Sequence, residues 1–312
     1  MERYFEELLA RCSDLPPMPT AVAHPCDAAS LSGAVEAAEK GLLAPVLVGP
    51  EHRIKAVAEA EGLDISPYKL VGTKHSHQSA EQAVAIVRLG EASVLMKGSL
   101  HTDELLHEVM KKETGLRTER RVSHVYVMQV PTYPRALMIT DAAISIYPTL
   151  EDKRDIVQNA IDLGHALGIA QPKVAILSAV ETVTPKIPGT VDAAALCKMA
   201  DRGQITGGLL DGPLAFDNAI NEEAAAVKGI RSPVAGRADI LIAPDLEAGN
   251  MIAKQLTFLA NAEAAGIVLG ARVPIILTSR ADSVQARLAS CAVAAIFAGW
   301  KQGLAEKAAS EN

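Results

Sequence analysis

The stretch Val273-Pro-Ile-Ile-Leu-Thr-Ser-Arg-Ala-Asp-Ser-Val-Gln-Ala-Arg287 decides how this chain is expected to fold. Its apolar run, residues 273–277, is typical of a buried strand, and a helical pattern follows Ser283. Hydroxyls, a guanidinium and a carboxylate therefore stand where a strand turns into a helix. Free backbone N–H groups and the positive end of the helix dipole favour an anion at such a turn. In open α/β sheets, ligands bind at this carboxyl edge of the strands.

The same pattern of short apolar strand, turn and longer helix recurs along the chain. Strands are expected at 44–49, 93–97 and 173–178, each with a helical pattern after it. This alternation is the signature of parallel strands covered by helices on both faces. We therefore predict an α/β protein whose sheets are mainly parallel.

Two consecutive strands, at 122–130 and 136–140, break the alternation. Their link, residues 131–135, suits antiparallel neighbours because a parallel crossover needs a dozen residues or more. A boundary is expected soon afterwards, near 141–149. The length of 312 residues exceeds what one core usually spans, so two lobes are expected.

Composition excludes several classes of protein. Hydrophobic residues make up 49% and charged residues 21%, an ordinary globular balance. The net charge of −7 argues against nucleic-acid binding, which needs a basic face. An anionic ligand would need a local basic pocket. The four cysteines show no metal or disulfide spacing, which favours reduced thiols in a cytoplasmic protein.

Neither end of the sequence indicates a membrane segment. The N-terminus is acidic and amphipathic, unlike a signal peptide. The apolar run 288–300 is too short to span a bilayer and is predicted to be a buried helix.

Several predicted strands end in polar clusters that would line one edge if the strands are parallel. These clusters are Lys97-Gly98-Ser99, Ser178, Asp211-Gly212-Pro213, Pro244-Asp245 and Ser279-Arg280. Asp211 is expected at the end of a strand over 205–210. The guanidinium of Arg280 presents a fork of donors that matches phosphate, although a structural ion pair is the alternative. Ser279, Asp282 or Ser283 could instead cap the final helix.

Other motifs favour or disfavour particular kinds of site. In Lys97-Gly98-Ser99, glycine lets the backbone approach a phosphate and lysine supplies charge, without the spacing of a Walker loop. The eight histidines show no metal spacing, so no metal is predicted. No Gly-x-Gly-x-x-Gly follows the first strand, and no Gly-x-Ser-x-Gly occurs, which disfavours a dinucleotide site and a serine hydrolase. The residues alone indicate an anion-binding cleft.

The sequence resembles the family of phosphate acetyltransferases and phosphate butyryltransferases. The resemblance extends from about residue 20 to 300. The motifs Lys97–Asp103 and Ser279–Ser283 are more similar to those of the butyryl branch. Seven stretches carry it in the family's order: Lys97–Asp103, Ile139–Ile144 with Pro148-Thr149, Val174–Ser178, Asp211–Asp217, Ser232–Gly236, Ala243–Asn250 and Thr278–Ser283.

The resemblance implies the reaction acyl-CoA + phosphate ⇌ acyl phosphate + CoA, with coenzyme A as a substrate and no metal or redox cofactor. It implies a homodimer and a fold similar to isocitrate and isopropylmalate dehydrogenases, with the active-site cleft between the lobes. The C-terminal segment would return to the first lobe. The expected lobes are therefore residues 1–142 with 272–312, and residues 143–271.

The resemblance also implies roles for site residues. Ser279 and Arg280 match the pair that contacts the phosphoryl group, and Asp282 is the nearest candidate for the base. The predicted phosphate and CoA contacts are Lys97, Gly98, Ser99, Ser123, Asp141, Ser178, Asp211, Asp245 and Asn250.

The chain departs from the family at two positions. Ala286 stands where acetyltransferases carry the proposed base, and Leu106 stands where they carry a phosphate-binding arginine. The missing base keeps a second hypothesis open, a non-catalytic sensor of acetyl-CoA or acyl phosphate with the same fold. A dehydrogenase of the isocitrate type is a third, without a matching cluster of aspartates.

Overall fold

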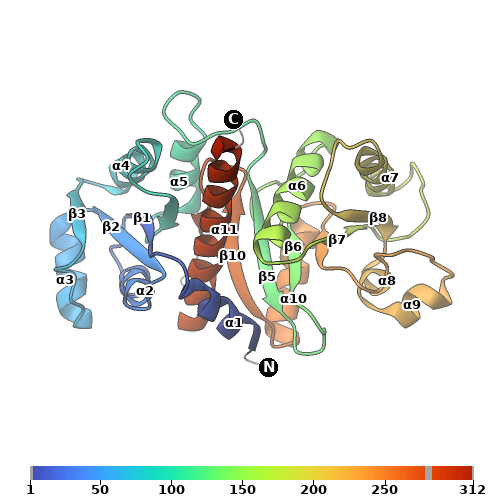
Figure 1. Cartoon of the computed structure of the whole chain (residues 1–312), viewed down its shortest axis with the longest axis horizontal. Helices are drawn as coiled ribbons and strands as arrows, with labels where there is room; N and C mark the ends of the chain where they lie inside the picture. The colour runs from blue at the N-terminus through green and yellow to red at the C-terminus, as the bar shows by residue number, and fades with distance from the viewer. Residues whose placement is uncertain (1–2, 278–282, 311–312) are drawn as a thin grey trace. The chain divides into compact units, whose positions relative to one another are not determined.

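The computed structural model describes residues 3–277 and 283–310, and it divides into two compact units. The first unit holds the chain up to Arg120 and from Ala265 onward, and the second is Arg121–Ala264. Both units combine mainly parallel strands with covering helices (Figure 1), so the predicted α/β class is confirmed.

The first unit has six strands in the order β3-β2-β1-β4-β11-β10. All neighbours pair in parallel except β10 with β11, which is antiparallel. Its strands are β1 (Met18–Ala23), β2 (Leu43–Gly49), β3 (Lys69–Gly72), β4 (Val94–Lys97), β10 (Glu263–Leu269) and β11 (Ile275–Ile276). β11 is the expected strand of the 273–277 run, and both its residues are fully buried.

Helices lie on both sides of these strands, α4 and α5 on one side and α2 on the other in the view of Figure 1. Alternating helices follow parallel strands because a parallel crossover must pass over a sheet face. The helices of this unit are α1 (Arg3–Cys12), α2 (Ala28–Glu39), α3 (Glu51–Glu61), α4 (Ser76–Arg88), α5 (Thr102–Val109) and α11 (Val284–Ser310).

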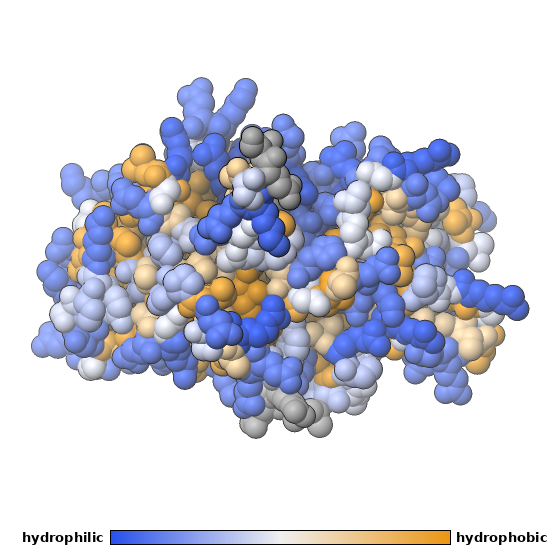
Figure 2. All heavy atoms as spheres, in the orientation of Figure 1, coloured by the Kyte–Doolittle hydropathy of each residue, from blue (hydrophilic) through white to orange (hydrophobic). Residues whose placement is uncertain are grey.

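The final helix, α11, is longer than the apolar run 288–300 predicted. Within the described residues it alone is long and apolar enough to cross a membrane by length and composition. However, 61% of its most apolar 18-residue window is buried in the protein, and it packs on α1, α2 and β11. Residues 287–298 of α11 are buried and residues 301–310 are mainly exposed, so the predicted buried helix is found over most of the 288–300 run. Figure 2 shows mainly hydrophilic residues, with hydrophobic residues in small patches, on the face drawn there.

The second unit has five strands in the order β5-β6-β9-β7-β8. β5 and β6 pair antiparallel, as their short link predicted, and the remaining pairs are parallel. Its strands are β5 (Ser123–Gln129), β6 (Leu137–Thr140), β7 (Lys173–Leu177), β8 (Leu209–Leu214) and β9 (Ile240–Ile242). Its helices are α6 (Leu150–Ala166), α7 (Pro188–Asp201), α8 (Phe216–Ile220), α9 (Glu222–Val227) and α10 (Leu246–Leu259).

The expected lobe bounds put residues 121–142 in the first lobe, whereas here β5 and β6 lie in the second unit. The physical reason is the ladder from β6 to β9, which joins Thr140 to Ile242. One side of this unit's core is built mainly from aliphatic side chains such as Ile139, Leu177 and Leu241, as the low aromatic content predicted.

The predicted position of one strand was wrong. The strand expected over 205–210 is β8, Leu209–Leu214, so Asp211 and Gly212 lie inside it rather than beyond its end. Its register against β7 shifts between Ala175 and Leu177, where Asp211 and Leu214 are the partners. An extra residue on β8 accommodates the turn-like Asp211-Gly212-Pro213 sequence within the strand.

Candidate functional site

The carboxyl edge of the first unit brings together residues from four strands. Ala23 of β1 pairs with Val48 of β2 and with Lys97 of β4, while Gly49 pairs with Gly72 of β3. The residues that follow these strands, among them His24 and Gly98, therefore lie side by side at one edge. This is the edge where parallel α/β sheets bind ligands.

The turn after β4 lies directly on the backbone after β1. The N–H groups of Gly98 and Ser99 donate to the carbonyls of Ala23 and His24, both at 2.8 Å. Ser99 Oγ also donates to His24 O at 2.9 Å and accepts from Cys26 N at 3.3 Å. A Cβ added to Gly98 would lie 2.5 Å from His24 O, so only glycine fits here. The predicted Gly98-Ser99 pair therefore forms a tight, fixed turn.

Lys97 also stabilises this turn. Its ammonium donates to the carbonyls of Gly98 at 3.2 Å and Leu100 at 3.1 Å. The side chain is half-buried, so its positive charge stays at the strand edge rather than extending into solvent. The predicted Lys97-Gly98-Ser99 cluster is thus one structure, with a cation beside a glycine turn.

His24 was not predicted as a site residue, yet it is the centre of this edge. It is 4% exposed and has a left-handed backbone, with φ of 57°. Its Nδ1 lies 2.9 Å from Ser79 Oγ, and its Nε2 lies 3.4 Å from an Arg53 nitrogen. Burial, with the positive charge of Arg53, lowers the pKa of His24 below its usual range. The sequence signal was a histidine directly after the first strand.

In the second unit, Asp141 organises the loop after β6. Its Oδ1 accepts from the N–H groups of Ala143 (3.0 Å) and Ile144 (3.1 Å), and its Oδ2 from Ser145 (2.9 Å). The carboxylate is 3% exposed. The peptide bond before it, Thr140-Asp141, is cis. The Asp141 carboxylate therefore fixes the backbone of the loop through three hydrogen bonds.

The start of α10 packs against the same loop. Asn250 Nδ2 donates to the carbonyl of Ala142 at 3.1 Å, and a Cβ on Gly249 would clash with the carbonyl of Asp141. Asp245 caps the helix, since its Oδ1 accepts from Ala248 N at 2.9 Å. The structure thus brings Asp141, Asp245 and Asn250 into one region, where each also has a structural contact.

His124, the second residue of β5, lies next to Asp141. Val125 pairs with Thr140, so His124 and Asp141 are the next positions on the two antiparallel strands. His124 is 1% exposed, and within the described chain its Nδ1 has no hydrogen-bond partner. Burial lowers its pKa to about 4, although the charge of Asp141 acts in the opposite direction. The imidazole is therefore neutral at pH 7.

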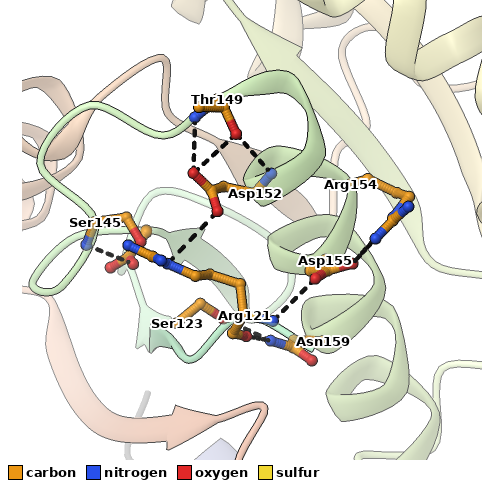
Figure 3. Close-up of polar contacts among 9 residues, drawn as sticks. Arg121, Ser123, Ser145, Thr149, Asp152, Arg154, Asp155 and Asn159 are labelled. Carbon is orange, nitrogen blue, oxygen red and sulfur yellow. Dashed lines mark hydrogen bonds and ion pairs between the residues drawn. The ribbon is translucent and has the colours of Figure 1, made fainter. Parts of the chain in front are cut away.

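Figure 3 shows the polar contacts where this loop enters α6. Thr149 and Asp152 form a capping box, with Thr149 Oγ1 accepting from Asp152 N at 3.2 Å and Asp152 Oδ2 accepting from Thr149 N at 3.0 Å. Ser123, predicted to bind substrate, is fully buried and accepts from Asn159 Nδ2 at 2.9 Å. In this position Ser123 joins β5 to α6.

The remaining predicted residues of this unit lie on β7 and β8. Ser178 directly follows β7 and is half-buried, and its N–H donates to Leu214 O at 2.9 Å. Asp211 Oδ1 accepts from Gly212 N at 2.9 Å within the strand. Only Ser178 therefore stands beyond its strand end, as the sequence predicted.

Three predicted catalytic residues, Ser279, Arg280 and Asp282, lie outside the described residues. Immediately after them, Ser283 Oγ accepts from Ala286 N at 3.1 Å. Among the alternatives for capping α11, Ser283 thus has a cap hydrogen bond. Ala286 and Leu106 lie in the first turn of α11 and within α5, respectively.

The cysteines offer no activated nucleophile. Burial raises the pKa of Cys26 to about 11 and that of Cys197 and Cys291 to about 12. Each is a free thiol that stays protonated at neutral pH. Across residues 3–277 and 283–310, no group of three His, Cys, Asp or Glu side chains is placed to hold a metal.

Comparison with known proteins shows the family of this chain. Residues 73–295 match the family model described as "Phosphate acetyl/butaryl transferase". A phosphate acetyltransferase of Rhizobium meliloti is 65% identical over 94% of this chain and 93% of its own length. A phosphate butyryltransferase of Clostridium beijerinckii is 43% identical over 96% of this chain and 99% of its own length. A solved branched-chain phosphotransacylase from Enterococcus faecalis V583 is 30% identical, with a TM-score of 0.79 over 90% of this chain and 99% of that structure.

Proposed function

This chain belongs to the phosphate acetyl/butyryltransferase family, and from that premise we propose which of its residues perform the reaction. It is a phosphate acyltransferase, which interconverts a short-chain acyl-CoA and phosphate with an acyl phosphate and CoA. The predicted enzyme class is thus confirmed. The observation that supports our assignment is the fixed Lys97-Gly98-Ser99 turn, which places a cation and closely packed backbone at a strand edge.

The turn suits one half of the reaction, the phosphate. We assign Lys97 and Ser99 to assist Ser279 and Arg280 in holding the phosphoryl group. Attack of phosphate on a thioester, or of a thiolate on an acyl phosphate, passes through a tetrahedral oxyanion. Fixed donors stabilise such a charge most when they need no reorganisation. Holding both substrates in line supplies much of the remaining acceleration.

The proton of the CoA thiol needs an acceptor in the synthesis of acyl-CoA. A free thiol has a pKa of about 8.5, so a modest base or a nearby positive charge is sufficient. We assign Asp282 as this base, since Ala286 cannot serve. In the second unit, the residues we propose as contacts for CoA or phosphate are Ser123, Asp141, Ser178, Asp211, Asp245 and Asn250.

Steady-state kinetics of single variants test the phosphate assignment. Arg280→Ala and Ser99→Ala should each raise the KM for phosphate and lower kcat/KM by about 10–1000-fold. Gln78→Ala is a matched control, since the Gln78 side chain accepts from Lys74 N near the start of α4 and has no assigned role in the site. Nearly full turnover of Arg280→Ala at low phosphate would show that Arg280 does not hold the phosphoryl group.

We propose acetyl-CoA as the preferred acyl donor, because identity to the phosphate acetyltransferase is 65% and to the phosphate butyryltransferase 43%. One methylene in a pocket changes selectivity by only about 1–3 kcal/mol, so both donors should react. Rates of thiol release from acetyl-, propionyl- and butyryl-CoA with phosphate decide the preference. A higher kcat/KM for butyryl-CoA would instead favour the butyryl branch that the motif wording resembles.

We also propose a homodimer in the cytoplasm. α10 exposes three large apolar side chains, Met251 (57%), Phe258 (78%) and Leu259 (82%), on a helix of the second unit. Large exposed apolar patches mark association sites. Sedimentation should give a dimer, and Phe258→Glu should shift it toward monomer. A monomeric wild type at micromolar concentration would contradict this proposal. The free cysteines agree with a reducing compartment.

A further inference from the structure

We propose that Arg53 is a phosphate-binding residue of the first unit, held at the strand edge by His24. The proposal rests on the proposed function, because its ligand is a phosphate group of one of the substrates. It begins from a row of polar side chains that runs from Thr73 at the end of β3 to Arg53 near the start of α3.

The links in this row are polar contacts, two of them short and the one to Arg53 longer. Thr73 Oγ1 lies 2.8 Å from Ser79 Oγ, and Ser79 Oγ lies 2.9 Å from His24 Nδ1. His24 Nε2 lies 3.4 Å from the terminal nitrogen NH1 of Arg53. Ser79 and His24 are buried, whereas Arg53 is exposed. The row therefore anchors an exposed guanidinium to a buried part of the unit.

The chemistry of arginine fixes the direction of the hydrogen bonds. A guanidinium only donates, so Nε2 of His24 must accept and Nδ1 must carry the proton. Nδ1–H then donates to Ser79 Oγ, which itself donates to His75 O at 3.0 Å. The imidazole is neutral in this arrangement. The backbone carbonyl of His24 accepts from Ser99 Oγ, so His24 positions both Arg53 and the Gly98-Ser99 turn.

Neutral histidine orients Arg53 without cancelling its charge. Among the residues the structure describes, Arg53 forms no ion pair with a carboxylate. The carboxylates that act on His24 are Asp27, which accepts from Ser30 N and Oγ, and Glu104, whose Oε2 is 3.9 Å from His77 Nδ1. A guanidinium has five donor hydrogens, of which this contact uses one. The others are available for an anion.

Arg53 reaches this strand edge from α3, and the same His24 that contacts it also holds Ser99. The phosphate that Arg53 binds is either inorganic phosphate, with the acyl phosphate made from it, or a phosphate of CoA. Both have the same oxygen geometry, so kinetics must separate them.

The test compares Arg53→Gln with Arg88→Gln, which alters an exposed arginine at the C-terminal end of α4. Arg53→Gln should raise one KM about 10–100-fold, the usual effect of a lost charge-assisted hydrogen bond, while Arg88→Gln changes none. A rise confined to phosphate identifies inorganic phosphate. A rise for acetyl-CoA, absent with acetyl-3′-dephospho-CoA, identifies the 3′-phosphate. A rise with both acetyl-CoA forms identifies the pyrophosphate. Unchanged KM values for all substrates overturn the proposal.

His24→Asn tests the positioning role. Asparagine tolerates the left-handed backbone and can keep the Ser79 contact, but it has no atom at Nε2. It should raise the same KM as Arg53→Gln by a smaller factor, and the double variant should match Arg53→Gln alone. Additive effects on KM would refute coupling through His24. Thermal unfolding of each variant separates these effects from loss of folding.

The two hypotheses fail in different ways. If the wild type releases no thiol from any acyl-CoA, the proposed function fails, and calorimetric binding of CoA and of phosphate to Arg53→Gln still tests the arginine. If the wild type is active and Arg53→Gln is kinetically normal, only the inference about Arg53 fails.

Discussion

Gly98 lies against His24 so closely that a Cβ on Gly98 would stand 2.5 Å from the His24 carbonyl oxygen and 2.6 Å from its carbonyl carbon. Both contacts are with backbone, which cannot move aside as a flexible side chain can. The end of β1 and the turn after β4 are therefore packed rigidly together. A substitution that separates them should lower the free energy of unfolding strongly.

Gly98→Ala is expected to lower the free energy of unfolding by about 2–4 kcal/mol, because the clash must separate two backbone segments. Urea denaturation measures the change. Gly303→Ala is the matched control, since Gly303 has open space around it within α11 and the substitution should be neutral or stabilise slightly. Equal stability of the two variants would contradict the close approach.

Asp141→Ala removes the acceptor of three backbone N–H groups in the loop before α6. Buried donors left without acceptors cost about 1–3 kcal/mol each, so we expect a loss of several kcal/mol. Thermal and urea unfolding measure it. If stability is unchanged while the KM for CoA or phosphate rises, the loop does not depend on Asp141 and the substrate-binding role predicted for it gains support.

The low pKa of His124 predicts a pH dependence of stability. Its folded pKa of about 4 lies below the unfolded value of about 6.5, so the unfolded state binds the proton more readily between these values. Stability should therefore be complete above pH 6.5 and fall as the pH drops toward 4, by on the order of 1–3 kcal/mol.

Carboxylates also titrate in this window, so the His124 contribution is a difference between variants. His124→Gln should lose less stability than the wild type between pH 7 and pH 4.5 in urea titrations. His107→Gln, on an exposed histidine of α5, should follow the wild type. Parallel curves for all three proteins would mean that His124 titrates normally.

The ion pair between α6 and α7 predicts an order of variants. Lys153 Nζ lies 2.7 Å from Asp192 Oδ2, and the side chains are 7% and 28% exposed. Asp192→Ala leaves the buried ammonium without its counter-charge and should cost about 3 kcal/mol, more than Lys153→Met, which removes that charge. Asp201→Ala, in the exposed pair with Lys198, should have no measurable effect. The reverse order in denaturation would show that Lys153 is not held by Asp192.

Sequence reasoning found the alternation of strands and helices because apolar runs and glycine ends carry that information locally. It missed the position of β8, since the register shift at Asp211-Gly212 depends on pairing with β7 rather than on the residues themselves. The substrate-binding role of Ser123 stays a prediction, and only the fold shows the contact of Ser123 with Asn159.

Only part of the site in the first unit could be predicted from the sequence. Lys97, Gly98 and Ser99 follow a strand, so their pattern is visible along the chain. Arg53 and His24 are 29 residues apart in sequence and meet through pairing of β1 with β2, which no spacing rule contains. A histidine after a first strand becomes informative only when the residues that follow the neighbouring strands are considered with it.

The chain order of the first unit has a consequence for synthesis on the ribosome. β11 pairs with β4 on one side and β10 on the other, and α11 covers it, yet these segments emerge after the whole second unit. The nascent first unit must therefore wait, with the apolar side of β4 and α1 uncovered, while residues 121–264 are made. We expect the second unit to resist protease first on stalled ribosomes, and the first only after α11 has left the exit tunnel.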